Sequence, residues 1–479
     1  MTTATDAPPL HRFTARAWAM LLVLCGVVFL EGIDLSMMGV ALPSMRADLD
    51  MSTTALQWVV SAYALGYGGF VLLGGRAADL LGRRRMFVAA LAVFIAFSGL
   101  GGLSSEGWML IVARFVTGVS AGFLTPAALS IITTTFAEGT VRNRALLVYA
   151  GIAAGGVSLG MVVGGLLTAL SWRWVFFAPV LAAAPLLPLA LRLVPAGEPP
   201  ARDGRGFDVA GALSITGGML LAVYSVVMAP EVSVGQTLAT ALASAALLAA
   251  FAVVERRSAS PLVRLGILRS VPLVRANVSA AVLVGSYMAF QFVVVLYLQQ
   301  VRGWSSVETG LALTVVGLDA ILAPTLTPPL VARFGTARVI GAGFAVAIVA
   351  YALFLPLGLD WTYWAMLPTM VLVGVAFALA YGPLTIAATD GVDAEEQGLA
   401  GGLLNVSMQF GAALGLAVAT AIAVAATDGG SAQAQLDGFR AALVVPVVAA
   451  AIGAAATATG LLTRRRAADE TAASRLSPR

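Results

Sequence analysis

The sequence predicts an all-α integral membrane protein that crosses the bilayer fourteen times. Of its 479 residues, 59% are hydrophobic and only 11% are charged, and the mean hydropathy is +0.93. A soluble domain carries about 25% charged residues, so this chain has too few charges to cover a surface that faces water. Apolar stretches of about 20 residues, the length that crosses the hydrocarbon core as a helix, recur along the chain and indicate the same fold class.

These apolar stretches define the predicted spans in order. They lie near 18–42, 56–75, 86–104, 108–135, 145–169, 174–193, 209–228, 236–254, 273–299, 307–330, 337–357, 361–386, 398–425 and 439–462. The first stretch contains two acids and is not followed by a small-residue cleavage site. We therefore interpret it as a retained helix and not as a signal peptide.

Arginine placement predicts the orientation of the spans. Lysine is absent, so arginine supplies all 28 basic residues. With both termini in the cytoplasm, 23 arginines fall in inside segments and 4 in outside loops, and Arg114 is left within a span. The positive-inside rule favours this orientation. Because arginine-only basic usage with abundant Ala and Gly is typical of a high-GC bacterial genome, we expect a multi-pass protein of the bacterial inner membrane.

The composition excludes most enzyme classes. Without lysine the chain has neither a Walker A loop nor a Schiff-base nucleophile. The single histidine, His11, precedes the first span, and the single cysteine, Cys25, lies within it. His/Cys metal clusters, disulfides and a Ser-His-Asp triad are therefore not expected. We expect no enzymatic activity, no cofactor and no metal site.

Similar segments recur with an offset of eight spans. The turn that ends at Gly82 resembles the one that ends at Gly335, and the segment around Pro126 resembles that around Pro383. Two six-helix bundles separated by two inserted helices produce this offset. The predicted parts are an N-terminal bundle (1–193), a cytoplasmic linker (194–208), two inserted transmembrane helices (209–254), a basic cytoplasmic segment (255–272), a C-terminal bundle (273–462) and a cytoplasmic tail (463–479).

Two motifs in the first half resemble those of the major facilitator superfamily. Residues 75–85 are similar to the superfamily's signature between spans 2 and 3, with Ala77 in place of the usual Leu. Residues 33–43 are similar to the first-helix motif of its fourteen-helix drug:proton antiporter family, with Gly39 where Asn is common.

Two further motifs resemble the same antiporter family. Residues 114–118 are similar to the fourth-helix motif, with Thr117 in place of Gln, and residues 160–165 to the fifth-helix antiporter motif, with Met161 in place of Pro. The resemblance implies two six-helix bundles with two additional helices. It also implies a proton-coupled antiporter that exports hydrophobic drugs, cationic ones included, or an antibiotic.

Four charged residues lie well inside predicted spans, away from the span ends, where an ionised group costs at least about 2.5–3.5 kcal/mol and usually marks function. They are Glu31, Asp34, Arg114 and Asp319. At 1.5 Å per residue, Asp34 lies roughly 12 Å and Arg114 roughly 9 Å from the outer ends of their spans, so they can meet. We expect Asp34 to carry the coupling proton, with Arg114 favouring its ionised form in one state and Glu31 as a second proton site. A static buried ion pair is the alternative.

The substrate is expected near the bilayer midplane. Glu31 lies roughly 17 Å deep, Asp319 roughly 18 Å and Gln409 roughly 16 Å. We expect the two acids, one from each bundle, to contact a cationic part of the substrate, with a polar packing role as the alternative. Aromatic side chains that face a cavity suit hydrophobic ligands. Flexible Met side chains suit such ligands as well. The candidates by position are Tyr63, Tyr287, Met288, Phe292, Phe377 and Tyr381.

Two further sets of residues are expected to serve conformational change. The loop between spans 2 and 3 provides a latch that biases alternating access, and small residues in span 5 let a neighbouring helix approach closely. The latch residues are Gly75, Asp79, Gly82, Arg83 and Arg84; the packing residues are Gly156, Gly160, Gly164 and Gly165. Simple topology anchors and ordinary helix packing are the alternatives.

The expected partners are a small-molecule drug or antibiotic, protons and the lipid bilayer, with no nucleic acid and with the chain as a monomer. A dedicated metabolite exporter and a proton-coupled uptake symporter remain alternatives within transport. A non-transporting membrane sensor or scaffold is the alternative from another class.

Overall fold

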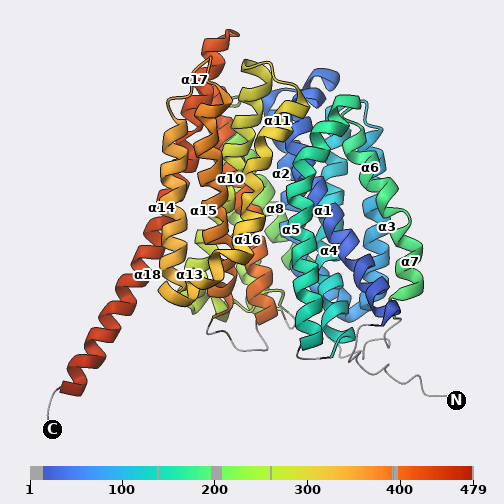
Figure 1. Cartoon of the computed structure of the whole chain (residues 1–479), viewed down its shortest axis with the longest axis vertical. Coiled ribbons are helices and arrows are strands. Elements are labelled where there is room, and N and C mark those ends of the chain that lie inside the picture. The colour runs from blue at the N-terminus through green and yellow to red at the C-terminus, as the bar shows by residue number, and fades with distance from the viewer. Residues whose placement is uncertain are drawn as a thin grey trace. The chain divides into compact units, whose positions relative to one another are not determined.

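The computed structural model describes residues 14–137, 140–195, 208–258, 261–390, 392 and 397–476, which form helices joined by short connections (Figure 1). Among these residues, thirteen helices are long and apolar enough to cross a membrane, which confirms the predicted all-α membrane fold. The count of fourteen stays a prediction. The span expected at 145–169 falls within the helix α5 (Thr140–Leu170). Among the described residues of α5, the apolar segment Leu159–Leu170 is shorter than a membrane span.

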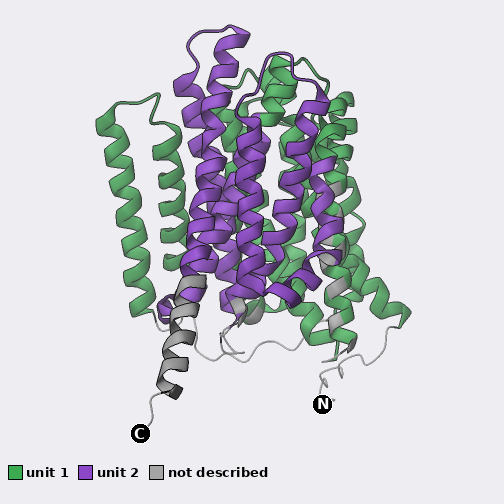
Figure 2. Cartoon of the chain, turned by 60° about the vertical axis from the view of Figure 1, so that its left-hand side comes forward, with its two compact units in different colours: residues 1–264, 294–314 green, residues 265–293, 315–479 purple. Residues whose placement is uncertain are grey.

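The chain divides into two compact units (Figure 2). Unit 1 comprises residues 1–264 and 294–314, and unit 2 comprises residues 265–293 and 315–479. This division follows spatial contacts and leaves the predicted order of bundles, linker and inserted helices as a prediction. Most of the expected linker, residues 196–207, and the side chains of the expected tail lie outside the described part of the chain.

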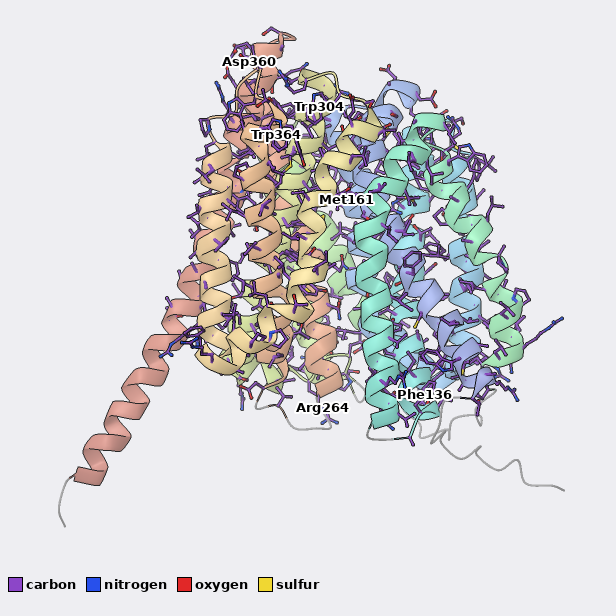
Figure 3. The ribbon with its side chains drawn as sticks, in the orientation of Figure 1. Phe136, Met161, Arg264, Trp304, Asp360 and Trp364 are labelled. Carbon is purple, nitrogen blue, oxygen red and sulfur yellow. The ribbon has the colours of Figure 1, made fainter. Side chains whose placement is uncertain are left out.

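Unit 1 is built from long helices that pack in pairs, with α1 against α5 and α2 against α4. Its other helices are shorter. The elements are α1 (Ala15–Leu49), α2 (Thr53–Leu81), α3 (Arg83–Gly102), α4 (Gly107–Thr135), α5, α6 (Trp174–Ala183), α7 (Leu186–Leu193), α8 (Val209–Val227), α9 (Val234–Arg257), the π-helical turn η2 (Tyr297–Val301) and α11 (Ser306–Leu313). Trp304 lies at one end of the unit, and Phe136 and Arg264 at the other (Figure 3).

The hairpin of α8 and α9 packs on the rest of unit 1 through α2. The Thr54 hydroxyl donates a hydrogen bond of 2.7 Å to Glu231 in the loop between α8 and α9. Farther along, Gly69 of α2 lies against Thr216 of α8 so closely that a methyl group at position 69 would overlap the threonine side chain. The two inserted helices are thus packed on α2 and are not held by their connections alone.

Several predicted spans are interrupted. The span expected at 174–193 is divided into α6 and α7 at Pro185, which has no N–H to continue the helix. The span expected at 307–330 is divided into α11, a 3₁₀ turn η3 (Thr314–Leu318), α12 (Asp319–Thr325) and α13 (Thr327–Phe334). Hydropathy reports how apolar a segment is, and it does not report these changes of helical geometry.

Unit 2 pairs α14 with α15 and α18. Its elements are the 3₁₀ turn η1 (Leu265–Arg269), most of α10 (Val271–Leu296), η3 from Val315 on, α12, α13, α14 (Thr336–Phe354), α15 (Tyr363–Thr389), α16 (Gln397–Ala426), α17 (Ala432–Ala442) and α18 (Val444–Leu476). The backbones of α10 and α16 approach each other most closely at glycines. A Cβ atom at Gly285 would lie 2.6 Å from the carbonyl oxygen of Gly411, and one at Gly411 would overlap the carbonyl of Ala281.

We expect Gly411→Ala to destabilise unit 2, because the added methyl group must push α10 and α16 apart. Overpacking of this kind costs about 1–3 kcal/mol. The apparent melting temperature of the purified chain in detergent measures the effect. Gly401→Ala, on the same helix with no atom within 4 Å of the added Cβ, is the matched control. Equal melting temperatures for the two variants would contradict the close packing.

Candidate functional site

The centre of unit 1 contains a buried ion pair between α1 and α4. Nη1 of Arg114 lies 2.6 Å from Oδ2 of Asp34, and each side chain is only 1% exposed. The guanidinium also donates from Nε to the backbone carbonyl of Val59 at 3.3 Å and lies 4.4 Å from the centre of the Tyr63 ring. Its Nη2 atom is buried without a hydrogen-bond partner. Asp34 is therefore the carboxylate that compensates the charge of Arg114.

Glu31 lies one turn before Asp34 on the same face of α1. Its Oε2 atom accepts a hydrogen bond of 2.8 Å from the Thr125 hydroxyl of α4, and its Oε1 atom is buried without a partner. Among the described residues, no salt bridge reaches Glu31. The hydroxyl groups of Tyr63 and Tyr149 lie within electrostatic range of this carboxyl. Glu31 is thus a second buried acid, without a cation of its own.

The sequence predicts that Asp34 and Arg114 can meet, and the structure brings them together. It also adds groups that the sequence analysis did not select, namely Thr125, Tyr149 and the Val59 carbonyl. Thr125 follows Arg114 by eleven residues, which is close to three helical turns and places both side chains on one face of α4. This spacing is the feature of the sequence that could have identified Thr125 as part of the site. No feature of the sequence could have identified the Val59 carbonyl, because every residue has a backbone carbonyl.

The predicted glycines of α5 pack against the helix that carries the two acids. A Cβ atom at Gly160 would lie 2.8 Å from the carbonyl oxygen of Ile33, and one at Gly164 would lie 2.7 Å from Cα of Met37. Gly156 meets the Phe29 carbonyl in the same way. Because the α1 residues also repeat every four positions, the two helices share one small-residue seam.

The fourth predicted glycine, Gly165, faces a different helix. A Cβ atom there would lie 2.8 Å from the carbonyl oxygen of Ser306, at the start of α11, whose hydroxyl donates to the Gly165 carbonyl at 3.3 Å. One α11 turn farther, Gly310 approaches the carbonyl of Met161, the residue found where the family's motif has Pro (Figure 3). The motif in α5 therefore packs on α1 with one side and on α11 with the other.

The end of α10 adds two polar contacts to unit 1 that the sequence analysis did not foresee. In the π-helical turn η2, the Gln299 amide donates to the Val40 carbonyl at 3.0 Å, and Gln300 accepts from Arg46 at 3.3 Å. A π turn shifts the register of a helix, so both glutamines point to α1. An unbroken α-helix over 273–299 would not present consecutive residues in this way.

In unit 2, Asp319 is grouped with aromatic side chains. It is the first residue of α12, directly after the 3₁₀ turn η3, and it is partly buried. The hydroxyls of Tyr287 and Tyr381 lie within electrostatic range of its carboxyl. The ring of Phe377 lies between them, 5.0 Å from Tyr287 and 5.1 Å from Tyr381. Tyr381 is 43% exposed, so one side of this group is open.

Not all of the predicted substrate residues belong to this group. Phe292 is buried in α10, and Gln409 is partly buried in α16. Among the described residues, neither has a hydrogen bond or ring contact with the group around Asp319. Tyr63 belongs to unit 1, where its ring lies beneath the guanidinium of Arg114.

The predicted latch is described in part. Gly82 joins α2 to α3 with φ of 98°, a conformation that favours glycine, and Arg84 donates to the Leu191 carbonyl at the end of α7. Arg83 is partly buried. Gly75 has only an ordinary contact of 3.7 Å with Pro126, so space alone does not require glycine there. The Asp79 side chain lies outside the described part of the chain.

The site combines buried acids, a buried arginine and aromatic side chains. Within the described ranges, no three His, Cys, Asp or Glu side chains gather closely enough to hold a metal ion. The buried acids, an arginine and tyrosine hydroxyls are groups that hold or exchange protons in a membrane.

Several known proteins are similar to this chain in sequence. The sequence is 36% identical to the cephamycin export protein CmcT of Amycolatopsis lactamdurans, over 88% of each chain. It is 34% identical to the puromycin resistance protein pur8 of Streptomyces alboniger, over 97% of this chain and 95% of the relative. A lincomycin resistance protein of Streptomyces lincolnensis is 32% identical over 86% of each chain.

Solved structures show the same fold at low identity. The nucleoside transporter NupG matches with a TM-score of 0.66 at 13% identity, covering 92% of this chain and 98% of that one. An auto-inhibited peptide transporter of the POT family matches with a TM-score of 0.67 at 16% identity, covering 93% and 97%. The sequence model of the Major Facilitator Superfamily matches residues 24–416. With relatives above 30% identity and a family match through most of its length, the chain belongs to the major facilitator superfamily of membrane transporters.

Proposed function

We propose that this protein is a proton-coupled antiporter that exports hydrophobic drugs, cationic ones included, or an antibiotic by alternating access. The relatives named for cephamycin export and for puromycin and lincomycin resistance support a drug exporter. The observation that carries proton coupling is the buried pair of Asp34 and Arg114 with Glu31 one turn away. The arginine distribution supports cytoplasmic termini, and the arginine-only basic usage with abundant Ala and Gly supports a bacterial inner membrane; the chain is proposed to act as a monomer.

Proton uptake by Asp34 would change the stability of the core of unit 1. While the carboxyl is ionised, it compensates the charge of Arg114 and connects α1 to α4. A protonated Asp34 leaves the guanidinium buried without a counter-ion, which costs several kcal/mol. The helices then gain free energy by rearranging until Arg114 meets another acceptor or water. This is how one proton drives a change of conformation in the proposal.

Glu31 links the proton to the cargo. Its free Oε1 atom accepts either a proton or a hydrogen bond from a cationic substrate, while Thr125 holds the other oxygen. Because Glu31 and Asp34 share a face of α1, a positive charge at one disfavours a positive charge at the other. The proton and the cationic substrate therefore compete for binding at these acids, and antiport requires such competition.

In unit 2, Asp319 with Tyr287, Phe377 and Tyr381 suits an aromatic or cationic cargo. Tyrosine rings attract cations at their faces, and the carboxylate supplies the neutralising charge. Phe292 and Gln409, which among the described residues have no hydrogen bond or ring contact with the group around Asp319, would affect cargo binding only indirectly. The glycine seam and the latch of Gly75, Asp79, Gly82, Arg83 and Arg84 would guide the rearrangement.

We expect Asp34→Asn to abolish drug movement driven by a pH gradient, since the amide cannot exchange the proton. The measurement is puromycin uptake into inside-out proteoliposomes with an acidic interior. A decrease of more than about tenfold is expected, the effect of losing 1.4 kcal/mol or more. Asp48→Asn, on the same helix but 47% exposed and paired with Arg173, is the matched control and should retain uptake. Full uptake by both Asp34→Asn and Glu31→Gln would refute the proton assignment.

We expect Asp319→Asn to weaken the transport of cationic cargo selectively. Loss of the carboxylate should raise the apparent KM for puromycin, which carries an amino group, by about tenfold, while an uncharged cargo changes little. Asp360→Asn, in a loop of the same unit (Figure 3), is the control. Equal effects on charged and uncharged cargo would show that Asp319 does not distinguish cationic from uncharged substrates.

A further inference from the structure

A second pair of acids lies away from the site described above, at the base of the hairpin of α8 and α9. Asp208 immediately precedes α8, and Glu255 lies two residues before the end of α9. The two residues are only 5% and 4% exposed. This end of the hairpin is the one near Arg264 in Figure 3, which the arginine distribution predicts to face the cytoplasm.

Each carboxyl uses one oxygen for a backbone contact and leaves the other without a partner. Oδ1 of Asp208 accepts from the Gly211 N–H at 2.7 Å, and Oε2 of Glu255 accepts from the Val263 N–H at 3.0 Å. Oδ2 of Asp208 and Oε1 of Glu255 are buried and have no hydrogen-bond partner. A buried acceptor of this kind costs about 1–3 kcal/mol, and more if it is charged.

The two carboxyl groups are neighbours because Gly211 has no side chain. A Cβ atom at Gly211 would lie 2.9 Å from Oδ1 of Asp208 and 2.9 Å from Oε1 of Glu255. These two oxygens are therefore at most twice that distance apart, less than 6 Å. The space between them is the space that any larger residue at position 211 would fill.

The surrounding charges do not neutralise the pair. Besides the pair itself, the described charged side chains on the packed elements are Arg76 of α2, Arg256 and Arg257 on α9, and Arg264 after it. Among the described residues, none of these forms a salt bridge with Asp208 or Glu255, and Nε and Nη2 of Arg76 are themselves unpartnered. Within the described ranges, the pair therefore has no ion-pair partner that would offset two negative charges.

Two ionised carboxylates at this separation in a buried site repel each other strongly, whereas one shared proton relieves the repulsion. We infer that Asp208 and Glu255 together form a proton-binding site that is separate from Asp34 and Glu31. The site takes up one proton from the solvent at the end of the hairpin where α8 begins. In the protonated state one carboxyl is neutral, and its new O–H can donate to an oxygen of the other. Glu255 then stays in place and holds the Val263 N–H, so that the segment after α9 is fastened to the hairpin.

We expect the pair of Asp208 and Glu255 to bind a single proton, shared between the two carboxyl groups. Infrared difference spectra of the full-length protein in lipid nanodiscs, recorded against pH, detect the C=O stretch of protonated carboxyl groups. Glu255→Gln and Asp208→Asn should each remove the same band, and the double variant should remove no more. Glu231→Gln, at the opposite end of the hairpin, is the matched control and should leave that band unchanged.

Three results would overturn the inference. They are an unchanged band in both single variants, the loss of two different bands, and a band that appears only when Mg²⁺ is removed. The last would show a site for a divalent cation instead of a proton. Because the spectra require no drug and no transport, failure here is distinguishable from failure of the proposed antiport.

Amide hydrogen exchange supplies a second readout that does not depend on the loss of a carboxyl. Gly211→Ala should push the carboxyl groups apart and raise the exchange rate at Val263 about tenfold, after correction for intrinsic exchange. Gly235→Ala, on α9 with no atom within 4 Å of the added Cβ, is the control. Equal protection at Val263 in both variants would refute the role of the pair in fastening this segment.

Discussion

The structure of unit 1 depends on how a membrane helix bundle compensates one buried arginine. Arg114 cannot lose its proton under ordinary conditions, so its neighbours must supply acceptors. Asp34, the Val59 carbonyl and the face of the Tyr63 ring do so from two other helices. The positions of α1, α2 and α4 are therefore coupled through one guanidinium, and any change in the charge of Asp34 acts on all three.

Close backbone packing makes this coupling extend beyond the ion pair. The glycines of α5 contact α1 at Phe29, Ile33 and Met37, on both sides of Glu31 and Asp34 in sequence. Helices that touch through their backbones have few side chains to absorb a displacement. A shift of α1 at the acids is thus transmitted to α5 and, through Gly165, to α11. The seam and the acids belong to one mechanical assembly.

The sequence predicts the fold and part of the site for identifiable physical reasons. Apolar length and arginine asymmetry are properties of whole segments, so they survive local irregularity and predict the all-α membrane class. Asp34 and Arg114 are costly in a membrane, so their meeting could be anticipated. The division of the predicted span 307–330 and the π turn at Tyr297–Val301 depend on local backbone geometry that composition does not report. Asp208 and Glu255 are distant in sequence, and only the packing of α8 on α9 reveals that they are neighbours.

If the two proposed acid-containing sites each take up a proton, the effects on structure are opposite. Asp34 is paired with a cation, so its protonation removes an attraction and loosens the contact between α1 and α4. Asp208 and Glu255 are paired with each other, so protonation removes a repulsion and adds a hydrogen bond at the base of the α8 and α9 hairpin. Acidification would therefore loosen the contact between α1 and α4 while it tightens the base of the α8 and α9 hairpin. The hairpin would then be most firmly held under the condition in which α1 and α4 rearrange.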